Sequence, residues 1–159
     1  MSKQKMLKLV GAGLVTAGIA FSAIAHEGHQ RDGVVGVRTA DMKDMGGAMK
    51  HLGGVAKGDE FSAASPAAAA RIHEVANAMA EQFPEGSGPG GEGIGETRAK
   101  PEIWSDPEGF AAEIEKLKAG ADSIVAAVTA QDRAALGAAM QQTGGACGSC
   151  HKAYRVPKK

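Results

Sequence analysis

The second half of the chain repeats mostly apolar residues at alternating intervals of four and three, the spacing of one face of an α-helix. The pattern runs from Phe110 to Val128 and returns from Leu136 to Tyr154. No stretch alternates apolar and polar residues with the period of two that a half-buried strand requires. The sequence therefore favours helices that pack along shared apolar stripes.

Two earlier segments have the same helical period. The first is expected from about Gln30 to Lys57. The second is expected to begin near Ser65-Pro66, a capping residue followed by a first-turn proline, and to stop at Pro84. The stripe of the first segment holds Val35, Arg38, Met42, Met45, Met49 and Leu52.

The two later helices have similar start signals, Asp106-Pro107 for one and Gln131-Asp132 for the other. The segment from Pro84 to Ser105 is rich in glycine and lacks the Gly-Lys-Ser/Thr of a phosphate-binding loop. We expect it to be a long connection that Ile103-Trp104 anchors on the core. The sequence thus predicts an all-α fold, an antiparallel four-helix bundle.

Both cysteines of the chain lie on the inward stripe of the last predicted helix. They occur as Cys147-Gly148-Ser149-Cys150-His151, the attachment signature of a c-type haem. Two thiols at this spacing can form thioethers with the haem vinyl groups, and the adjacent histidine can bind the iron from the proximal side. The sequence therefore predicts one covalent haem c on the C-terminal helix, attached through Cys147 and Cys150 and ligated by His151.

The same motif can serve two other chemistries. A redox disulfide of the thioredoxin type needs a strand–helix context, which the sequence does not contain. A zinc site needs a fourth ligand, and the remaining histidines are scattered along the chain. Haem attachment remains the prediction.

The N-terminus has the pattern of a secretory signal peptide. Basic residues precede an uncharged run from Leu9 to Ile24, which ends in the small-x-small pattern Ala23-Ile24-Ala25. The run is short for a membrane anchor, and polar residues follow it at once. We expect residues 1–25 to be removed and residues 26–159 to form the domain, in the periplasm and without a membrane span.

The charge balance excludes several classes of function. The whole chain has 18 basic and 18 acidic residues, and loss of the three signal lysines leaves 15 against 18. No basic stripe is present and few aromatic residues could stack on bases, so we expect no nucleic-acid partner. No nucleophile or acid–base pair is evident, so we do not expect an enzyme.

These features together resemble the cytochrome c′ family, the class II cytochromes c of bacteria. In that family the haem motif lies near the C-terminus, on the last helix of a four-helix bundle. The segment Cys147 to Arg155 is similar to the family's terminal pattern, and Lys100 to Asp106 to its segment before the third helix. Lys57-Gly58 resembles the turn after the first helix. The resemblance covers essentially all of the chain after the signal peptide.

The resemblance implies roles for two residues of the first helix. An arginine at the position of Arg38 lies near a haem propionate, and the residue four positions later, here Met42, faces the distal side of the iron. Many members have a non-ligand there and five-coordinate iron, whereas a low-spin branch has a methionine that binds it. We expect Met42 to be the distal ligand. From the residues alone, Met42 could instead fill the core, and Arg38 could reach the surface.

The resemblance also bears on Arg155, on partners and on function. Arg155 lies near the proximal imidazole by analogy with the family, and is otherwise an exposed terminal residue. The family implies a homodimer through the first two helices. The favoured function is a one-electron carrier that exchanges electrons with redox partner proteins of the periplasm. The alternatives are a five-coordinate protein that binds nitric oxide or carbon monoxide, and a cysteine redox module without haem.

Overall fold

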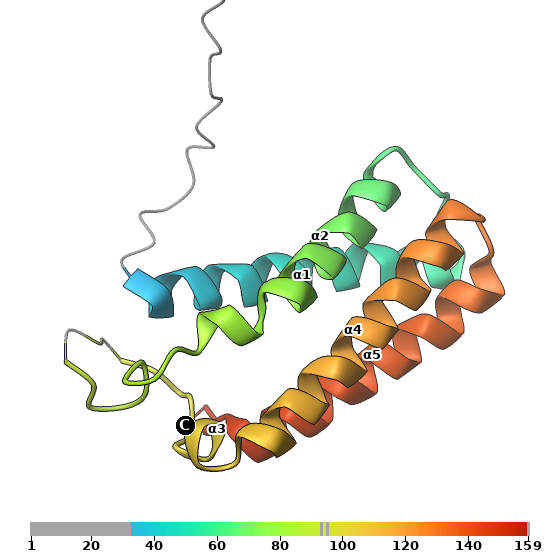
Figure 1. Ribbon diagram of the computed structural model, residues 1–159. Coiled ribbons are helices and arrows are strands. Elements are labelled where there is room, and N and C mark those ends of the chain that lie inside the picture. Colours follow the sequence, from blue (N-terminus) through green and yellow to red (C-terminus); the bar gives the residue numbers. More distant parts are fainter. Residues whose placement is uncertain (1–32, 93, 95, 159) are drawn as a thin grey trace, which may run out of the picture.

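The computed structural model describes residues 33–92, 94 and 96–158, so the expected signal peptide lies outside the described residues. Four long helices form the domain, and the described residues contain no strand beyond a single isolated β-bridge (Figure 1). The all-α prediction is confirmed. The elements in order are α1 (Gly33–Lys57), α2 (Ala64–Ala78), the 3-10 helix η1 (Ala80–Gln82), α3 (Glu102–Ser105), α4 (Pro107–Thr129) and α5 (Arg133–Tyr154).

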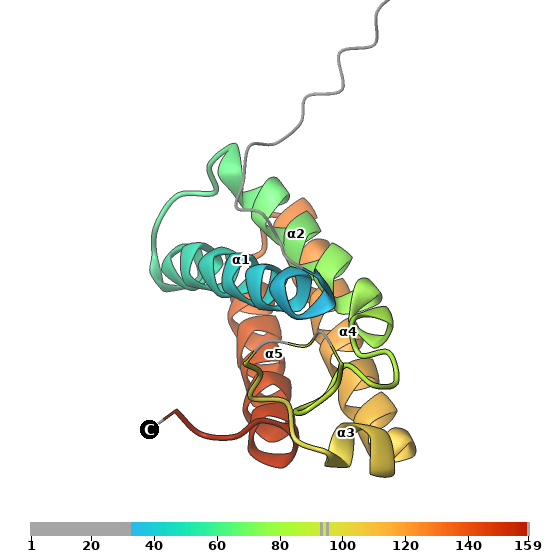
Figure 2. The same cartoon turned by 90° about the vertical axis from the view of Figure 1, so that its left-hand side faces the viewer.

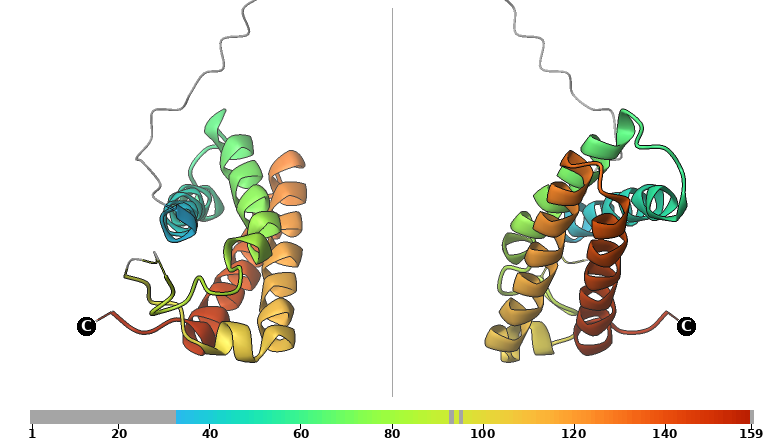
Figure 3. Two further views of the ribbon diagram at one scale, coloured as in Figure 1. Left: turned by 60° about the vertical axis from the view of Figure 1, so that its left-hand side comes forward. Right: turned by 90° about the vertical axis from the view of Figure 1, so that its right-hand side faces the viewer.

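The long helices pack as two antiparallel pairs. α1 lies against α2 and α4 against α5, while contacts of α2 with α4 and of α1 with α5 join the pairs into a bundle (Figure 3). None of the described helices is both long enough and apolar enough to cross a membrane. The short α3 lies beside the start of α4, at the end of the bundle where α5 stops.

Helices α4 and α5 begin where their capping residues predict. The Asp106 carboxylate accepts a hydrogen bond from the Gly109 amide at 3.1 Å, and the Asp132 carboxylate accepts one from the Ala135 amide at 2.9 Å. Each bond satisfies a backbone donor that the first turn of a helix leaves without a partner. Both start signals are confirmed.

The predicted start of the second helix is wrong in one respect. α2 begins at Ala64, and its preceding residue Ala63 makes no side-chain capping bond. Ser65 lies inside the helix and is fully buried, with its hydroxyl 3.2 Å from Nε2 of His51 on α1. The hydroxyl therefore satisfies a contact between helices instead of capping one.

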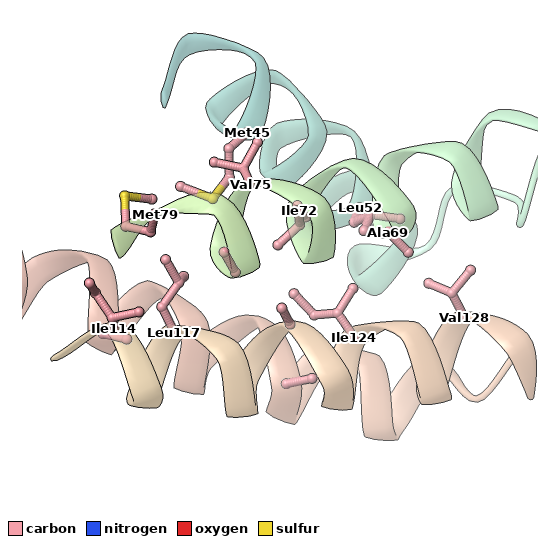
Figure 4. Packing of buried hydrophobic residues seen from close by; sticks show 14 of the residues in the cluster. Met45, Leu52, Ala69, Ile72, Val75, Met79, Ile114, Leu117, Ile124 and Val128 are labelled. Carbon is pink, nitrogen blue, oxygen red and sulfur yellow. The ribbon is translucent and has the colours of Figure 1, made fainter. Parts of the chain in front are cut away.

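All four long helices contribute to the core, and Figure 4 shows labelled core side chains of α1, α2 and α4. Every position of the α4 heptad stripe is at most 8% exposed, which confirms the predicted face. Gly120 allows α4 and α5 to approach closely, since a Cβ there would lie 2.5 Å from Oγ1 of Thr143. The stripe residues are Phe110, Ile114, Leu117, Ala121, Ile124 and Val128.

The long connection is anchored as expected. Ile103 is 4% exposed, and the Trp104 indole N–H donates to the carbonyls of Phe83 and Pro84 at 3.1 and 3.0 Å. These contacts hold α3, which leads into α4, against the residues that follow η1.

The connection also pairs with the residues that follow α5. The Lys100 amide donates to the Tyr154 carbonyl at 3.0 Å, and the Val156 amide donates to the Arg98 carbonyl at 2.8 Å. These bonds flank the antiparallel bridge between Ala99 and Arg155. We call this short ladder the C-terminal clamp. It holds residues 98–100 and 154–156 in one register.

Tyr154 joins the end of α5 to the start of α4. Its hydroxyl donates to the Asp106 carboxylate at 2.8 Å, and its ring meets the edge of Phe110 with centroids 5.2 Å apart. Burial, the hydrogen bond to Asp106 and nearby negative charge raise the pKa of Tyr154 from its ordinary value of 10.0 to about 12. The folded protein therefore holds the phenolic proton more tightly than the unfolded chain does.

This difference predicts an alkaline loss of stability. The contribution of Tyr154 is fully present below pH 10 and is lost as the pH rises from about 10 through 12, because the unfolded chain releases the proton first. Urea denaturation across this range should show a steeper decline for the wild type than for Tyr154→Phe. Asp132→Ala removes only a helix cap, so it should lower stability by about 1 kcal/mol at every pH. Equal slopes for wild type and Tyr154→Phe would contradict the prediction.

Candidate functional site

A pocket of about 450 Å³ lies at one end of the bundle. Figure 2 looks at this end, where α1 begins, α5 stops and the connection from α2 to α3 passes between them. The structure brings Arg38, Met42, Cys150, His151 and Arg155 to this pocket, and Cys147 packs half-buried against the core beside it. Apolar walls are supplied by Met79, Phe83, Ala99, Ile103 and Phe110.

Arg38 is buried at 4% exposure in the wall of the pocket. Its guanidinium donates to the Ser87 carbonyl at 2.9 Å, to the Ser87 hydroxyl at 3.1 Å and to the Thr97 hydroxyl at 2.7 Å. It also lies over the Phe83 ring, 4.8 Å from the centroid. One side chain of α1 therefore ties the connection down over the pocket.

All of the groups that accept these hydrogen bonds from Arg38 are neutral. Within the described ranges, no carboxylate lies at ion-pair distance from Arg38, and burial lowers the pKa of its guanidinium. A buried cation is costly unless an anion compensates it. The pocket therefore favours a ligand that brings negative charge to Arg38.

The residue before Met42 fixes the register of this part of α1. Asp41 is buried and pairs with Arg71 of α2 at 2.5 Å, while the Gln82 amide donates to its other carboxylate oxygen at 2.5 Å. Met42 is half-buried and lines the pocket. Because Asp41 locks α1 against α2 and η1, the Met42 side chain is held on the pocket side of α1.

On the α5 side, Cys150 and His151 line the pocket and Cys147 lies beside it. Burial raises the pKa of both thiols, that of Cys150 to about 11, and the negative charge of Glu113 adds to the effect at Cys150. Burial lowers the pKa of His151, and the nearby cations Arg155 and Arg98 lower it further. A neutral imidazole keeps the lone pair that a metal ligand needs.

A sequence model of the family described as "Cytochrome C'" matches residues 33–155. The chain belongs to the cytochrome c′ family. Cytochrome c-556 of Agrobacterium fabrum is 35% identical over 146 residues, which cover 91% of this chain and 95% of that relative.

Solved structures of cytochromes c′ have the same fold. The cytochrome c′ of Rubrivivax gelatinosus matches with a TM-score of 0.67 and 28% identity, over 80% of this chain and 98% of that one. A nitric oxide complex of a mutant cytochrome c prime from Alcaligenes xylosoxidans matches with a TM-score of 0.68 and 28% identity, over 83% and 100% of the two chains. The predicted four-helix bundle is confirmed.

Membership of the cytochrome c′ family gives this protein one covalent haem c, and the pocket's own chemistry fits that group. It combines apolar walls, thiols on one helix, a neutral imidazole and a buried cation. Within residues 33–92, 94 and 96–158, no three His, Cys, Asp or Glu side chains converge to hold a metal ion by themselves.

Several residues at the pocket of this cytochrome c′ family member were not predicted to lie there. Ser87 and Thr97 hold Arg38 across 49 and 59 positions of sequence, and no local pattern marks them. Met79, which is buried in the core, also lines the pocket from the end of α2 and presents a second thioether there. Arg98 lines it from the connection. Only the clustering of these residues in space identifies them.

Proposed function

We propose that this protein is a periplasmic one-electron carrier of the cytochrome c′ family whose haem is ligated by His151 and Met42. The main support is that these two side chains, from α5 and α1, line the same pocket. When bound, a haem supplies a reversible one-electron couple. Two ligands held by packed helices keep the coordination the same in both oxidation states, which keeps reorganisation small.

Each site residue has a separate role in this proposal. Cys147 and Cys150 hold the haem covalently, and His151 is the proximal ligand. Met42 is the distal ligand, whose thioether favours the ferrous state and so raises the reduction potential. Arg38 lies where a propionate would neutralise its buried charge, and Arg155 lies near the proximal imidazole.

The remaining features concern location and assembly. The signal pattern over residues 1–25 supports export to the periplasm. We found no acid–base pair or nucleophile in the sequence that would support catalysis, so the proposal is a carrier and not an enzyme.

A homodimer through α1 and α2 is also proposed, and sedimentation at micromolar concentration would test it.

Absorption spectra of both oxidation states test the ligands. Low-spin iron should give sharp α and β bands when reduced and a weak far-red band from sulfur–iron charge transfer when oxidised. A broad high-spin spectrum in both states would contradict ligation by Met42. Absence of any Soret band after expression in a host that matures c-type cytochromes would contradict haem binding itself.

A five-coordinate protein that binds nitric oxide or carbon monoxide is the second candidate. One structural relative was solved as a nitric oxide complex, and the flexible methionine side chain can leave the distal side of the pocket open. Under this alternative, carbon monoxide binds the ferrous wild type rapidly and completely. Under the carrier proposal, Met42 must first be displaced, so binding is slow or weak.

A further inference from the structure

Five exposed cations lie in the pocket lining or on the chain segments next to it. Lys43, Arg98 and Arg155 line the pocket itself, Lys152 follows His151 on α5, and Lys158 follows the C-terminal clamp. We call these five residues the mouth cluster.

The mouth cluster is not neutralised locally. Glu96 is the single acidic residue in the pocket lining, and none of the five cations forms an ion pair within the described part of the chain. By contrast Arg71, Lys116 and Lys118 elsewhere on the surface are paired with carboxylates. Even with two haem propionates present, positive charge remains in excess around the mouth.

The clamp holds part of this cluster in place. The Arg98 carbonyl accepts from the Val156 amide at 2.8 Å, and the next residue, Ala99, is bridged to Arg155. Val156 is 45% exposed and is the exposed large apolar residue of the described chain. An exposed apolar side chain such as Val156, with cationic residues next to it, is the arrangement found in small, transient protein interfaces.

This local charge is opposite in sign to that of the whole domain. The chain after residue 25 carries 15 basic and 18 acidic residues. A negatively charged protein with a positive patch at its cofactor orients an approaching acidic molecule toward that patch.

We propose that the mouth cluster and Val156 form the docking face for an acidic redox partner protein. The proposal rests on the carrier function above and deepens it, because it assigns the face through which electrons enter and leave. Arg98 and Arg155 line the same pocket as His151. A partner docked on them would therefore stand beside the proximal side of the haem.

The salt dependence of electron transfer tests the sign of this face. Ferrous holoprotein would be oxidised in stopped-flow experiments by ferricyanide, a trianion, and by tris(phenanthroline)cobalt(III), a trication, over a series of ionic strengths. If the mouth cluster governs the reaction, the ferricyanide rate should fall as salt increases, and the cobalt rate should not. If the net negative charge governs it, the opposite pattern results, and the proposal is overturned.

Charge-reversal variants locate the face. The double variant Lys43→Glu and Arg98→Glu should slow oxidation by ferricyanide about tenfold at low salt and should not slow oxidation by the cobalt complex. Loss of cations near the haem also lowers the reduction potential, because it favours the ferric state. This change alone would accelerate oxidation, so a slower reaction with ferricyanide must come from weaker docking. The matched control, the double variant Lys50→Glu and Lys57→Glu, reverses two charges at exposed α1 positions outside the pocket and should leave the ratio of the two rates near the wild-type ratio. Equal effects of both variants would overturn the proposal.

Two further probes identify the partner class. Poly-L-glutamate should inhibit oxidation by ferricyanide at low salt in the wild type and have little effect on the double variant. Binding to phosphatidylglycerol vesicles that the double variant loses, without inhibition by poly-L-glutamate, would show a membrane-binding face and overturn a protein partner. Absorption spectra of the same samples report the axial ligands separately, so failure of the carrier proposal is distinguishable from failure of the docking face.

Discussion

Replacing Met42 by alanine should convert the iron from a low-spin, six-coordinate form to a high-spin, five-coordinate form. The pocket offers the distal side a thioether from α1, and alanine has no atom that can replace it. We expect the far-red band to disappear, carbon monoxide to bind quickly, and the reduction potential to fall by on the order of 100 mV. Spectra, carbon monoxide titration and redox titration of the purified holoprotein measure these three effects.

The structure identifies a control position for this experiment, Met49, and an alternative candidate for the distal ligand, Met79. Met49 lies on the same helix and is half-buried, but it does not line the pocket, so Met49→Ala should leave the spectrum unchanged. Met79 lines the pocket from the end of α2, the helix that packs against α1, and is the other methionine among the residues that line it. If Met42→Ala keeps the low-spin spectrum and Met79→Ala loses it, the ligand assignment to Met42 is wrong.

Replacing both Cys147 and Cys150 by serine should abolish covalent haem attachment. Each thiol normally adds its sulfur and proton across one vinyl group, and a serine hydroxyl does not react in this way. Mass spectrometry should find the bare polypeptide, and any residual haem should be extracted by acidified organic solvent. The single variants retain one attachment point, so they should keep haem through one thioether.

Loss of the haem should also destabilise the fold. The pocket of about 450 Å³ would lose its apolar contents, and the buried guanidinium of Arg38 would lose the propionate that we propose as its anionic partner. We expect the free energy of unfolding to fall by at least about 2 kcal/mol. Ser149→Ala alters the exposed residue between the two cysteines, which bonds to Glu113, and should retain both haem and most of the stability. A double variant as stable as the wild type would contradict this account.

The parts of the fold that the sequence predicted correctly depend on local patterns. The α4 stripe is buried throughout because its spacing matches one helix face, and Asp106 and Asp132 cap their helices through bonds three residues away. Ser65 followed the same local rule and was misassigned, because its hydroxyl instead meets His51 from another helix. A capping preference is weak compared with a buried polar contact between helices.

The candidate site was predictable only in part, because only some of its residues lie close together in the sequence. Cys147, Cys150 and His151 are contiguous, so their motif is readable directly. The neighbours of Arg38 come from positions 44 to 59 residues away, and their approach depends on how the glycine-rich connection folds back. Which methionine can bind the iron, Met42 or Met79, likewise depends on the tertiary arrangement, because each belongs to a different helix and both line the pocket.

The C-terminal clamp has a consequence for how the domain opens. The Thr97 hydroxyl accepts from Arg38 of α1 at 2.7 Å and from the Ala99 amide at 3.2 Å, and Ala99 is bridged to Arg155. The final residues are thus joined to the first helix by consecutive bonds that run around the rim of the pocket. Fraying at the carboxyl end should therefore weaken the hydrogen bonds that hold residues 97–100 at the edge of the pocket.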